Sequence, residues 1–330
     1  MDRLVCDIND VFTSYSEELK RVEEELLGLF QSDAFLIPAI GNHIVKSGGK
    51  RLRPLFLILS SELCGYREHS RIVLASIIEA IHTASLLHDD VVDGAELRRG
   101  KPTAHSIWGN QIVVLVGDYL YSNALRIAVS QRSQAVMEVL SRATTQMTEG
   151  ELLQLSKIGD PEVKEDEYLK IISSKTGALI SAACQIGGIL ADETEQRINA
   201  LKEYGMKTGI AFQMVDDILD FMADEEGLGK RLGKDLDEGK ITMPLILLLR
   251  RCDERERERV KEIINNNDSI TDQSLSEILK LFRKYQTIDA SMARAQEFVE
   301  EAKRALEPFP MSRQKEELFC LAEYALLRRK

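Results

Sequence analysis

The sequence predicts an all-α fold, and three observations lead to that prediction. The 330 residues include only seven prolines, so few positions interrupt long helices. Apolar residues recur at steps of three and four over long stretches, which is the period of an amphipathic helix. No convincing alternation of polar and apolar residues is present, although Ile112–Val116 could locally be taken for a strand. We therefore expect a single domain over residues 1–330.

Helical periodicity covers most of the chain. The first stretch runs from Leu4 to Phe30. The other predicted helices cover residues 71–88, 111–128, 134–156, 166–190, 194–222, 241–250, 274–284, 290–306 and 314–328. Clusters of helix-breaking residues separate them at 47–49, 94–102, 159–161, 224–239, 265–272 and 308–310. Because all these breaks are short, none of them marks a domain boundary.

Composition and charge exclude several classes of protein. The chain has 43 lysines and arginines against 54 aspartates and glutamates, a net charge of −11, which argues against a nucleic-acid binder. We find no apolar segment of the ~20 residues that span a bilayer, and the acidic N-terminus does not resemble a signal peptide. The five cysteines form no Cys-x-x-Cys pair. We expect a cytoplasmic protein without a transmembrane segment.

The pattern Asp-Asp-x-x-Asp occurs twice, at Asp89–Asp93 and at Asp216–Asp220. On a helix the first and last aspartates of each copy share a face, and their repulsion must be offset. Both copies follow apolar sequence, which fits poorly with the alternative that they are solvated acidic helix ends. Carboxylates without a cysteine or histidine cluster suit Mg²⁺, which proteins hold with few carboxylates plus substrate phosphates. The pair predicts a clamp for a phosphorylated substrate.

Basic residues accompany the two acidic motifs. Gly48–Pro54 places three cations in a glycine-opened turn that leads into a helix. Further cations stand at Arg98, Arg99, Lys101, Lys175, Lys230, Lys234 and Lys240. Each cluster alone is compatible with a solvated loop, but lysine and arginine beside the acidic motifs favour binding of diphosphate oxygens.

Other nucleotide and catalytic motifs do not fit. Gly227–Gly233 has one residue too many for a dinucleotide fingerprint and follows no predicted strand. Neither Gly49-Lys50 nor Gly233-Lys234 is followed by Ser or Thr, as a P-loop requires. No Gly-x-Ser-x-Gly sequence is present, so the sequence does not predict an α/β-hydrolase.

Eight short motifs in order resemble those of the trans-isoprenyl diphosphate synthases, most closely the long-chain group of the octaprenyl diphosphate synthase type. The motifs are GGKRLRP (48–54), IHTASLLHDDVVD (81–93), RRGKPT (98–103), GDYL (117–120), GELLQ (150–154), Lys175-Thr176, QMVDDILD (213–220) and GKITMP (239–244). The resemblance implies the isoprenoid-synthase fold, a helical bundle around a central cavity, and a homodimer. It also implies head-to-tail condensation of isopentenyl diphosphate with an allylic diphosphate such as farnesyl diphosphate.

The resemblance also assigns roles to individual residues. Several Mg²⁺ ions would be bound by Asp89, Asp93 and Asp216, with Asp90, Asp217 and Asp220 in support. Isopentenyl diphosphate would be bound by Lys50, Arg53, His82 and Arg99. The allylic diphosphate would be bound by Arg98, Lys175, Lys230 and Lys240, and Thr176 and Gln213 would line the reacting carbons. Catalysis would depend on Lys175, Thr176, Gln213, Asp89 and Asp216. Arg231, where relatives often have proline, leaves the local loop shape open.

Product length is expected to depend on Ala84 and Ser85, five and four residues before Asp89. Small residues there suggest an open tunnel and a long product, with octaprenyl diphosphate for a quinone side chain as the best candidate. A short-chain synthase and the catalytic subunit of a heteromeric heptaprenyl-type synthase remain alternatives. A terpene cyclase or a non-catalytic subunit is disfavoured, because both aspartate motifs and GGKRLRP are present.

Overall fold

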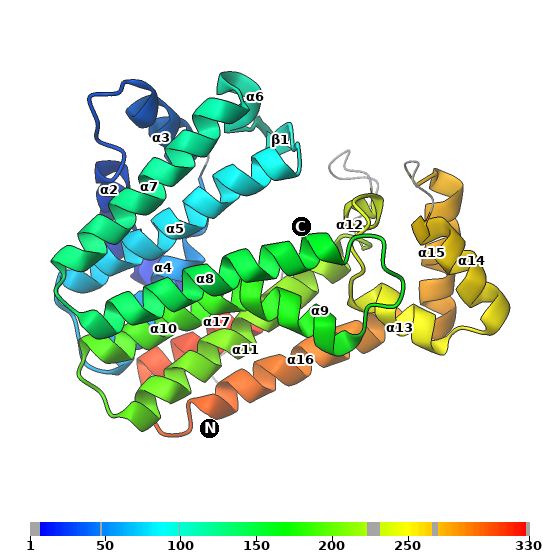
Figure 1. Ribbon diagram of the computed structural model, residues 1–330. Helices are drawn as coiled ribbons and strands as arrows, with labels where there is room; N and C mark the ends of the chain where they lie inside the picture. The colour runs from blue at the N-terminus through cyan, green and yellow to red at the C-terminus, as the bar shows by residue number, and fades with distance from the viewer. Residues whose placement is uncertain (1–6, 47, 99, 223–231, 266–269, 328–330) are drawn as a thin grey trace. The chain divides into compact units, whose positions relative to one another are not determined.

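The structure is a computed structural model that describes residues 7–46, 48–98, 100–222, 232–265 and 270–327. Figure 1 shows that it is built from helices, which confirms the predicted all-α class. The first elements are α1 (Ile8–Ser14), α2 (Ser16–Gly28), α3 (Leu36–Lys46), α4 (Leu52–Leu63), α5 (Ser70–Val92), β1 (Leu97–Arg98), β2 (Lys101–Pro102), α6 (Ala104–Trp108), α7 (Asn110–Ser130) and α8 (Gln134–Ser156). The later elements are α9 (Glu165–Ile172), the π-helix η1 (Ser173–Gly177), α10 (Ala178–Leu190), α11 (Glu195–Leu219), α12 (Lys234–Asp237), α13 (Met243–Arg251), α14 (Glu254–Asn265), α15 (Asp272–Tyr285), α16 (Thr287–Ala305) and α17 (Arg313–Leu327).

The structure differs in several places from the helices expected from periodicity. The helix predicted from Leu4 to Phe30 is interrupted at Tyr15, and the one predicted over 166–190 contains the π-helix. Ile112–Val116 lies inside α7 and is not a strand. Helix α3 was not predicted because it contains Pro38 and Gly41, and α14 was not predicted because it is dominated by charged residues. Tertiary packing of a few apolar side chains stabilises both helices.

The chain divides into two compact units. Unit 1 comprises residues 1–144, 182–202 and 308–318, and unit 2 comprises residues 145–181, 203–307 and 319–330. The division falls within helices α8, α10, α11 and α17. The single domain expected over residues 1–330 stays a prediction.

Unit 1 is organised around α5, which packs against α2, α4 and α7. Leu74, Ile77, Ile78 and Ile81 are fully or nearly fully buried along it. Among the described residues, α5 and α7 are long and apolar enough to cross a membrane, which the sequence analysis had not recognised. In α5 the apolar window is 72% buried, because this helix forms the protein core, whereas the window in α7 is only 33% buried. The carboxyl-terminal end of α5 carries the first acidic motif.

Unit 2 holds the second acidic motif at the end of α11. Helix α13 has seven buried residues in succession, Met243–Leu249, and packs against α9, α14, α15 and α16. Pro244 stands in its first turn, where a missing backbone N–H costs nothing. Phe221 packs edge-on against Phe282, with ring centroids 5.0 Å apart. This ring contact packs Phe221, two residues after the end of α11, against α15.

Candidate active site

The first acidic motif closes helix α5 in unit 1. Asp89 is half-buried in the last turn, Asp90 is buried, and Asp93 is the exposed C-cap residue. Asp89 and Asp93 lie one turn apart on the same face. The two carboxylates of this motif that solvent reaches are therefore the two expected to bind Mg²⁺ directly.

A short hairpin brings Arg98 back to this motif. Strands β1 and β2 pair antiparallel, with Arg98 opposite Lys101, and Gly100 adopts a positive φ of 73° in the turn. The Arg98 guanidinium places Nε 2.9 Å and Nη2 2.8 Å from Oδ1 of Asp90. Its side chain remains 42% exposed, so part of the guanidinium is accessible. Asp90 thus positions a cation that was expected to contact the allylic diphosphate.

The basic turn before α4 is anchored to α5 by its middle cation. Arg51 adopts a left-handed conformation with φ 50° and is buried. It donates to Glu79 on α5 at 3.0 Å, to Glu23 at 2.9 Å and to the Val45 carbonyl oxygen. Of the three cations in this turn, Arg51 therefore serves the fold. Lys50 is exposed at the same turn.

The other unit 1 candidates lie along α5. His82 is half-buried seven residues before Asp89, so the two share a face. Arg53, in the first turn of α4, is also half-buried. Ala84 is buried, while Ser85 is half-buried and donates to the His82 carbonyl oxygen.

In unit 2, the π-helix that carries Lys175 and Thr176 rests on the GELLQ motif. A Cβ atom at Gly150 would lie 2.7 Å from Cβ of Ser174 and 2.9 Å from the Lys175 nitrogen, so only glycine permits this approach. The Lys175 Nζ atom is 2.6 Å from Glu151 Oε2 and 2.8 Å from Gln154 Oε1. The sequence analysis recognised the motif without a role, and its role here is to cradle Lys175.

A string of buried and partly buried hydrogen bonds joins the other candidates of unit 2. Thr176 Oγ1 donates to Gln213 Oε1 at 2.7 Å, and Gln213 Nε2 donates to Asp217 Oδ1 at 2.8 Å. The second oxygen of Asp217 accepts a 2.6 Å hydrogen bond from the Tyr168 hydroxyl. Tyr168 was not predicted, because nothing in the local sequence of α9 relates it to Asp217. Asp216, in contrast, is half-buried beside this string.

Burial controls the protonation of this string. Burial, and then repulsion from Asp235, raises the pKa of Asp217 well above its usual value, and the hydrogen bonds from Tyr168 and Gln213 oppose that shift. Burial and the Asp217 carboxylate likewise raise the pKa of Tyr168 well above 10. Tyr168 therefore keeps its proton at neutral pH and acts as a hydrogen-bond donor.

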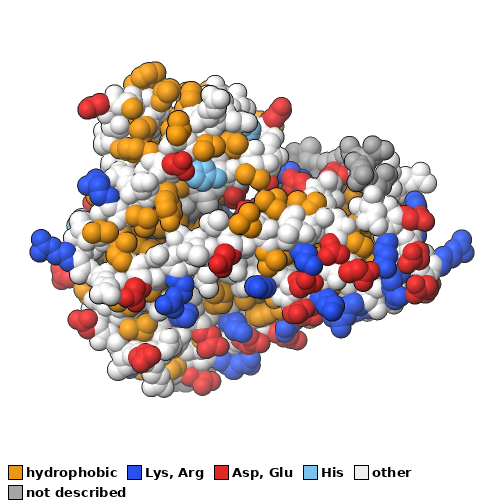
Figure 2. Space-filling model, viewed as in Figure 1, with side chains coloured by type: hydrophobic (Ala, Val, Ile, Leu, Met, Phe, Trp, Pro, Cys, Tyr) orange, Lys and Arg blue, Asp and Glu red, His pale blue; other side chains and the backbone are white. Residues whose placement is uncertain are grey.

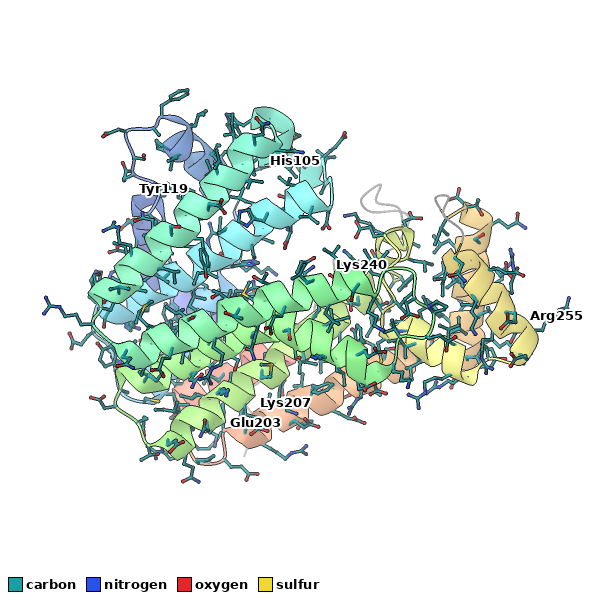
Figure 3. The ribbon with its side chains drawn as sticks, in the orientation of Figure 1. His105, Tyr119, Glu203, Lys207, Lys240 and Arg255 are labelled. Atoms are coloured by element: carbon teal, nitrogen blue, oxygen red, sulfur yellow. The ribbon has the colours of Figure 1, made fainter. Side chains whose placement is uncertain are left out.

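The last aspartate of the second motif supports the segment that carries Lys240. Asp220 is buried, and its Oδ2 accepts from the Asp235 nitrogen at 2.9 Å. The Asp235 carbonyl oxygen in turn accepts from the Lys240 nitrogen. Figure 3 shows Lys240 between α12 and α13, and its ammonium group pairs with Glu238. Burial acts to raise the pKa of Glu238, but the ammonium groups of Lys240 and Lys234 outweigh this effect and lower the pKa below its usual value.

These unit 2 residues line one pocket of about 80 Å³. Its lining includes Tyr168, Lys175, Gln213, Asp217, Lys240 and Thr242. The buried Thr242 hydroxyl has no hydrogen-bond partner in the described part of the chain. An unpaired buried hydroxyl is costly, so a ligand rich in oxygen atoms would be stabilised here beside two lysines. The lining therefore fits a diphosphate.

The donor set also fits a divalent cation that is shared with substrate. Over the described ranges, no group of three or more His, Cys, Asp or Glu side chains could hold a metal ion by itself. Mg²⁺ needs only one or two carboxylates when phosphate oxygens complete its coordination. Arg99, Lys230 and the unusual Arg231 lie outside the described residues.

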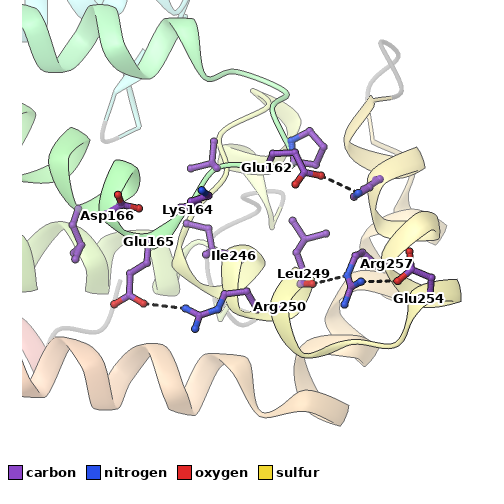
Figure 4. Close-up of a pocket in the computed structure, with 13 residues that line it drawn as sticks. Glu162, Lys164, Glu165, Asp166, Ile246, Leu249, Arg250, Glu254 and Arg257 are labelled. Carbon is purple, nitrogen blue, oxygen red and sulfur yellow. Dashed lines mark hydrogen bonds and ion pairs between the residues drawn. The ribbon is translucent and has the colours of Figure 1, made fainter.

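A larger pocket of about 830 Å³ in unit 2 has a different character. Apolar side chains of α9 and α13 line it, and its charged rim is paired internally (Figure 4). Glu165 binds Arg250, Glu254 binds Arg257, and Glu162 binds Lys261. None of the residues predicted to bind diphosphate lines this pocket, so we do not assign it to a substrate.

Comparisons with known proteins identify the family of the chain. The family model described as polyprenyl synthetase matches residues 36–282. An octaprenyl diphosphate synthase from Haemophilus influenzae is 38% identical over 96% of both chains. A short chain isoprenyl diphosphate synthase from Methanothermobacter thermautotrophicus is 35% identical over 98% of this chain and 99% of the relative. The crystal structure of a polyprenyl synthase from Caulobacter crescentus, complexed with calcium and isoprenyl diphosphate, has a TM-score of 0.92, 38% identity and full coverage of both chains.

An all-helical fold shared with polyprenyl synthases, with an aspartate-rich motif at the ends of two helices, indicates an enzyme that transfers prenyl groups. The chain belongs to the polyprenyl synthetase family.

Proposed function

We propose that this chain is a long-chain trans-polyprenyl diphosphate synthase that condenses isopentenyl diphosphate head-to-tail onto an allylic diphosphate, with octaprenyl diphosphate as product. The observation that carries the proposal is the unit 2 pocket, which Lys175, Lys240 and Gln213 line and where Thr176 donates a hydrogen bond to Gln213. Cations and a hydroxyl at one end suit a diphosphate, and neutral dipoles next to them suit the carbons that it leaves.

The residues divide the chemistry between them. Mg²⁺ held by Asp89, Asp93 and Asp216 would neutralise the departing diphosphate. Lys175 and Lys240 hold its oxygens, and the oxygens of Thr176 and Gln213 face the electron-deficient allylic carbon. Loss of a proton to the departing diphosphate completes the condensation, so no protein base is required.

Two small side chains on α5, and not the percentage of sequence identity to relatives, indicate the length of the product. The octaprenyl and short-chain relatives differ by only three percentage points of identity, 38% against 35%. Ala84 lies about 7.5 Å along the helix from Asp89, at 1.5 Å per residue, where a bulky side chain would stop a growing chain. Ala84 and Ser85 therefore support a long product, for which a quinone is the expected acceptor.

A homodimer in the cytoplasm is the assembly that we propose. Helix α7 exposes an apolar stripe in which Leu115 is 67% and Val129 59% exposed. Figure 2 shows hydrophobic side chains gathered over this helix. Association of two copies through α7 would bury the stripe. Light scattering of the purified chain should give twice the mass of 37.2 kDa, and Leu115→Glu should reduce it to the monomer.

The decisive experiment uses the purified chain with radiolabelled isopentenyl diphosphate, farnesyl diphosphate and Mg²⁺, with chromatography of the dephosphorylated products. We expect octaprenyl product, no product in EDTA, and shorter products from Ala84→Phe, with Ala84→Leu as a milder variant. Wild-type products of farnesyl or geranylgeranyl length would establish the short-chain alternative. No product without a second polypeptide would establish the heteromeric one. An unchanged long product from a folded Ala84→Phe enzyme would show that the tunnel runs elsewhere.

A further inference from the structure

The pocket of unit 2 contains a tyrosine to which neither the sequence nor the proposed reaction assigns a role. Tyr168 is only 3% exposed on α9, and its hydroxyl lies 2.6 Å from Oδ2 of Asp217 on α11. Asp217 is 6% exposed. The partner of this hydroxyl is thus not solvent but the middle carboxyl of the second acidic motif, 49 residues away in the chain.

Asp217 connects Tyr168 to the side chain that faces the reacting carbons. Its Oδ1 accepts from the amide nitrogen of Gln213, one helical turn earlier on α11, at 2.8 Å. A glutamine amide presents an acceptor oxygen on one side and a donor nitrogen on the other. With the nitrogen turned to Asp217, the oxygen of Gln213 is turned to Thr176, whose hydroxyl donates to it at 2.7 Å.

The direction of the amide matters for the chemistry. A positive charge that develops on an allylic carbon is stabilised by oxygen dipoles and destabilised by an N–H group that points at it. If the Asp217 carboxyl rotated, the Gln213 amide would lose the partner that fixes its direction. Tyr168 holds that carboxyl from the side opposite to Gln213, since each partner takes a different oxygen.

We propose that Tyr168 is a positioning residue, which fixes the Asp217 carboxyl and through it directs the Gln213 oxygen, together with that of Thr176, toward the reacting carbons. This inference rests on the proposed condensation. Both carboxylate oxygens of Asp217 accept hydrogen bonds from protein side chains, so the role of Asp217 is to orient Gln213.

The test removes the hydroxyl oxygen of Tyr168. Tyr168→Phe should lower the single-turnover condensation rate by about tenfold or more, as small misplacements of positioning groups do. The KM values for isopentenyl diphosphate and for the allylic primer should stay within about twofold, because the hydroxyl that is removed donates to Asp217. Tyr15→Phe is the matched control: it deletes a buried hydroxyl that donates to Glu62 and Glu317 in unit 1. Its rate should equal that of the wild type at a similar loss of thermal stability.

A double-mutant cycle separates positioning from a general structural effect. In a Gln213→Leu background, Tyr168→Phe should cause no further loss of rate, because the group that it positions is gone. If Tyr168→Phe does not accumulate as folded protein, Asp217→Asn takes its place, with the same expected loss of rate and the same dependence on Gln213.

Three results would overturn the inference: a wild-type rate in Tyr168→Phe, an equal loss of rate in Tyr15→Phe, or a full additional loss in the Gln213→Leu background. Failure of the proposed function is recognised separately, because the wild-type chain would then form no polyprenyl diphosphate. An active wild type with an unaffected Tyr168→Phe variant would reject only the positioning role.

Discussion

The two acidic motifs share one pattern and differ in what surrounds it. At the end of α5, the middle aspartate, Asp90, pairs with the half-exposed guanidinium of Arg98, and the last, Asp93, is exposed. At the end of α11, the middle aspartate, Asp217, is held by the neutral donors Tyr168 and Gln213, and the last, Asp220, is buried.

This difference separates two functions of the same residue type. In both motifs the first aspartate, Asp89 or Asp216, is half-buried. In the first motif the middle carboxylate, Asp90, orients the cation Arg98. In the second, Asp217 orients the neutral side chain of Gln213, and Asp220 holds the backbone at Asp235. Identical spacing therefore does not give identical chemistry.

The largest expected effect comes from the aspartates that the two motifs have in common. Asp89→Ala and Asp216→Ala should each lower turnover by about a thousandfold or more, since each removes a carboxylate that is proposed to hold the Mg²⁺ beside the diphosphate. Steady-state assays over a range of Mg²⁺ concentrations measure this effect. Asp166→Ala, at an exposed aspartate of α9, is the control and should retain full turnover. Equal activity in Asp216→Ala would mean that only the first motif holds metal.

Substitutions of the two middle aspartates should lower the stability of the protein by different amounts. Asp217→Ala leaves the Tyr168 hydroxyl and the Gln213 amide buried without an acceptor, which should lower the free energy of unfolding by about 2–4 kcal/mol. Asp90→Ala should cost about 1 kcal/mol or less, because Arg98 is 42% exposed and can be solvated. Urea denaturation of the two variants measures the difference. Similar losses would show that the two environments are equivalent.

Substitution of each predicted diphosphate-binding cation should raise the KM for one substrate and not for the other. Arg53→Ala and His82→Ala should raise the KM for isopentenyl diphosphate by about tenfold, and Lys175→Ala and Lys240→Ala should do so for the allylic primer, because a charge-assisted hydrogen bond contributes about 1.5–3 kcal/mol. Initial rates with each substrate varied in turn provide the measurement. A variant that raises both KM values equally contradicts the assignment of that residue.

The smallest difference between the two motifs is expected for substitutions of their last aspartates. Asp220→Ala removes the acceptor of the Asp235 nitrogen and loosens the segment that carries Lys240. Its KM for the allylic primer should exceed that of Asp93→Ala by about threefold, the value of one modest hydrogen bond. Equal KM values in the two variants would show that Asp220 does not support Lys240.

Several features of the fold were predictable because they are local. Periodicity gave α8 its observed bounds, 134–156, and placed both acidic motifs on helices. The π-helix at Ser173–Gly177 was not predictable, because the residues 166–190 keep a helical pattern throughout. It lies where Gly150, more than 20 residues earlier in the chain, closely approaches Ser174 and Lys175.

The candidate site likewise has features that the sequence predicts and features that depend on tertiary packing. The residue types and their spacing on one helix already indicate oxygen ligands for a hard cation and lysines for a diphosphate, because neighbours at i and i+4 share a face whatever surrounds them. The partner of each aspartate was not readable, since Arg98 lies 8 residues from Asp90 and Tyr168 lies 49 residues from Asp217. The same is true of Arg51, which has the same charge as the neighbours predicted to bind phosphate and yet is buried against Glu79. Burial and hydrogen bonding depend on which segments the packed chain brings together, and the pattern of a single helix contains no information about them.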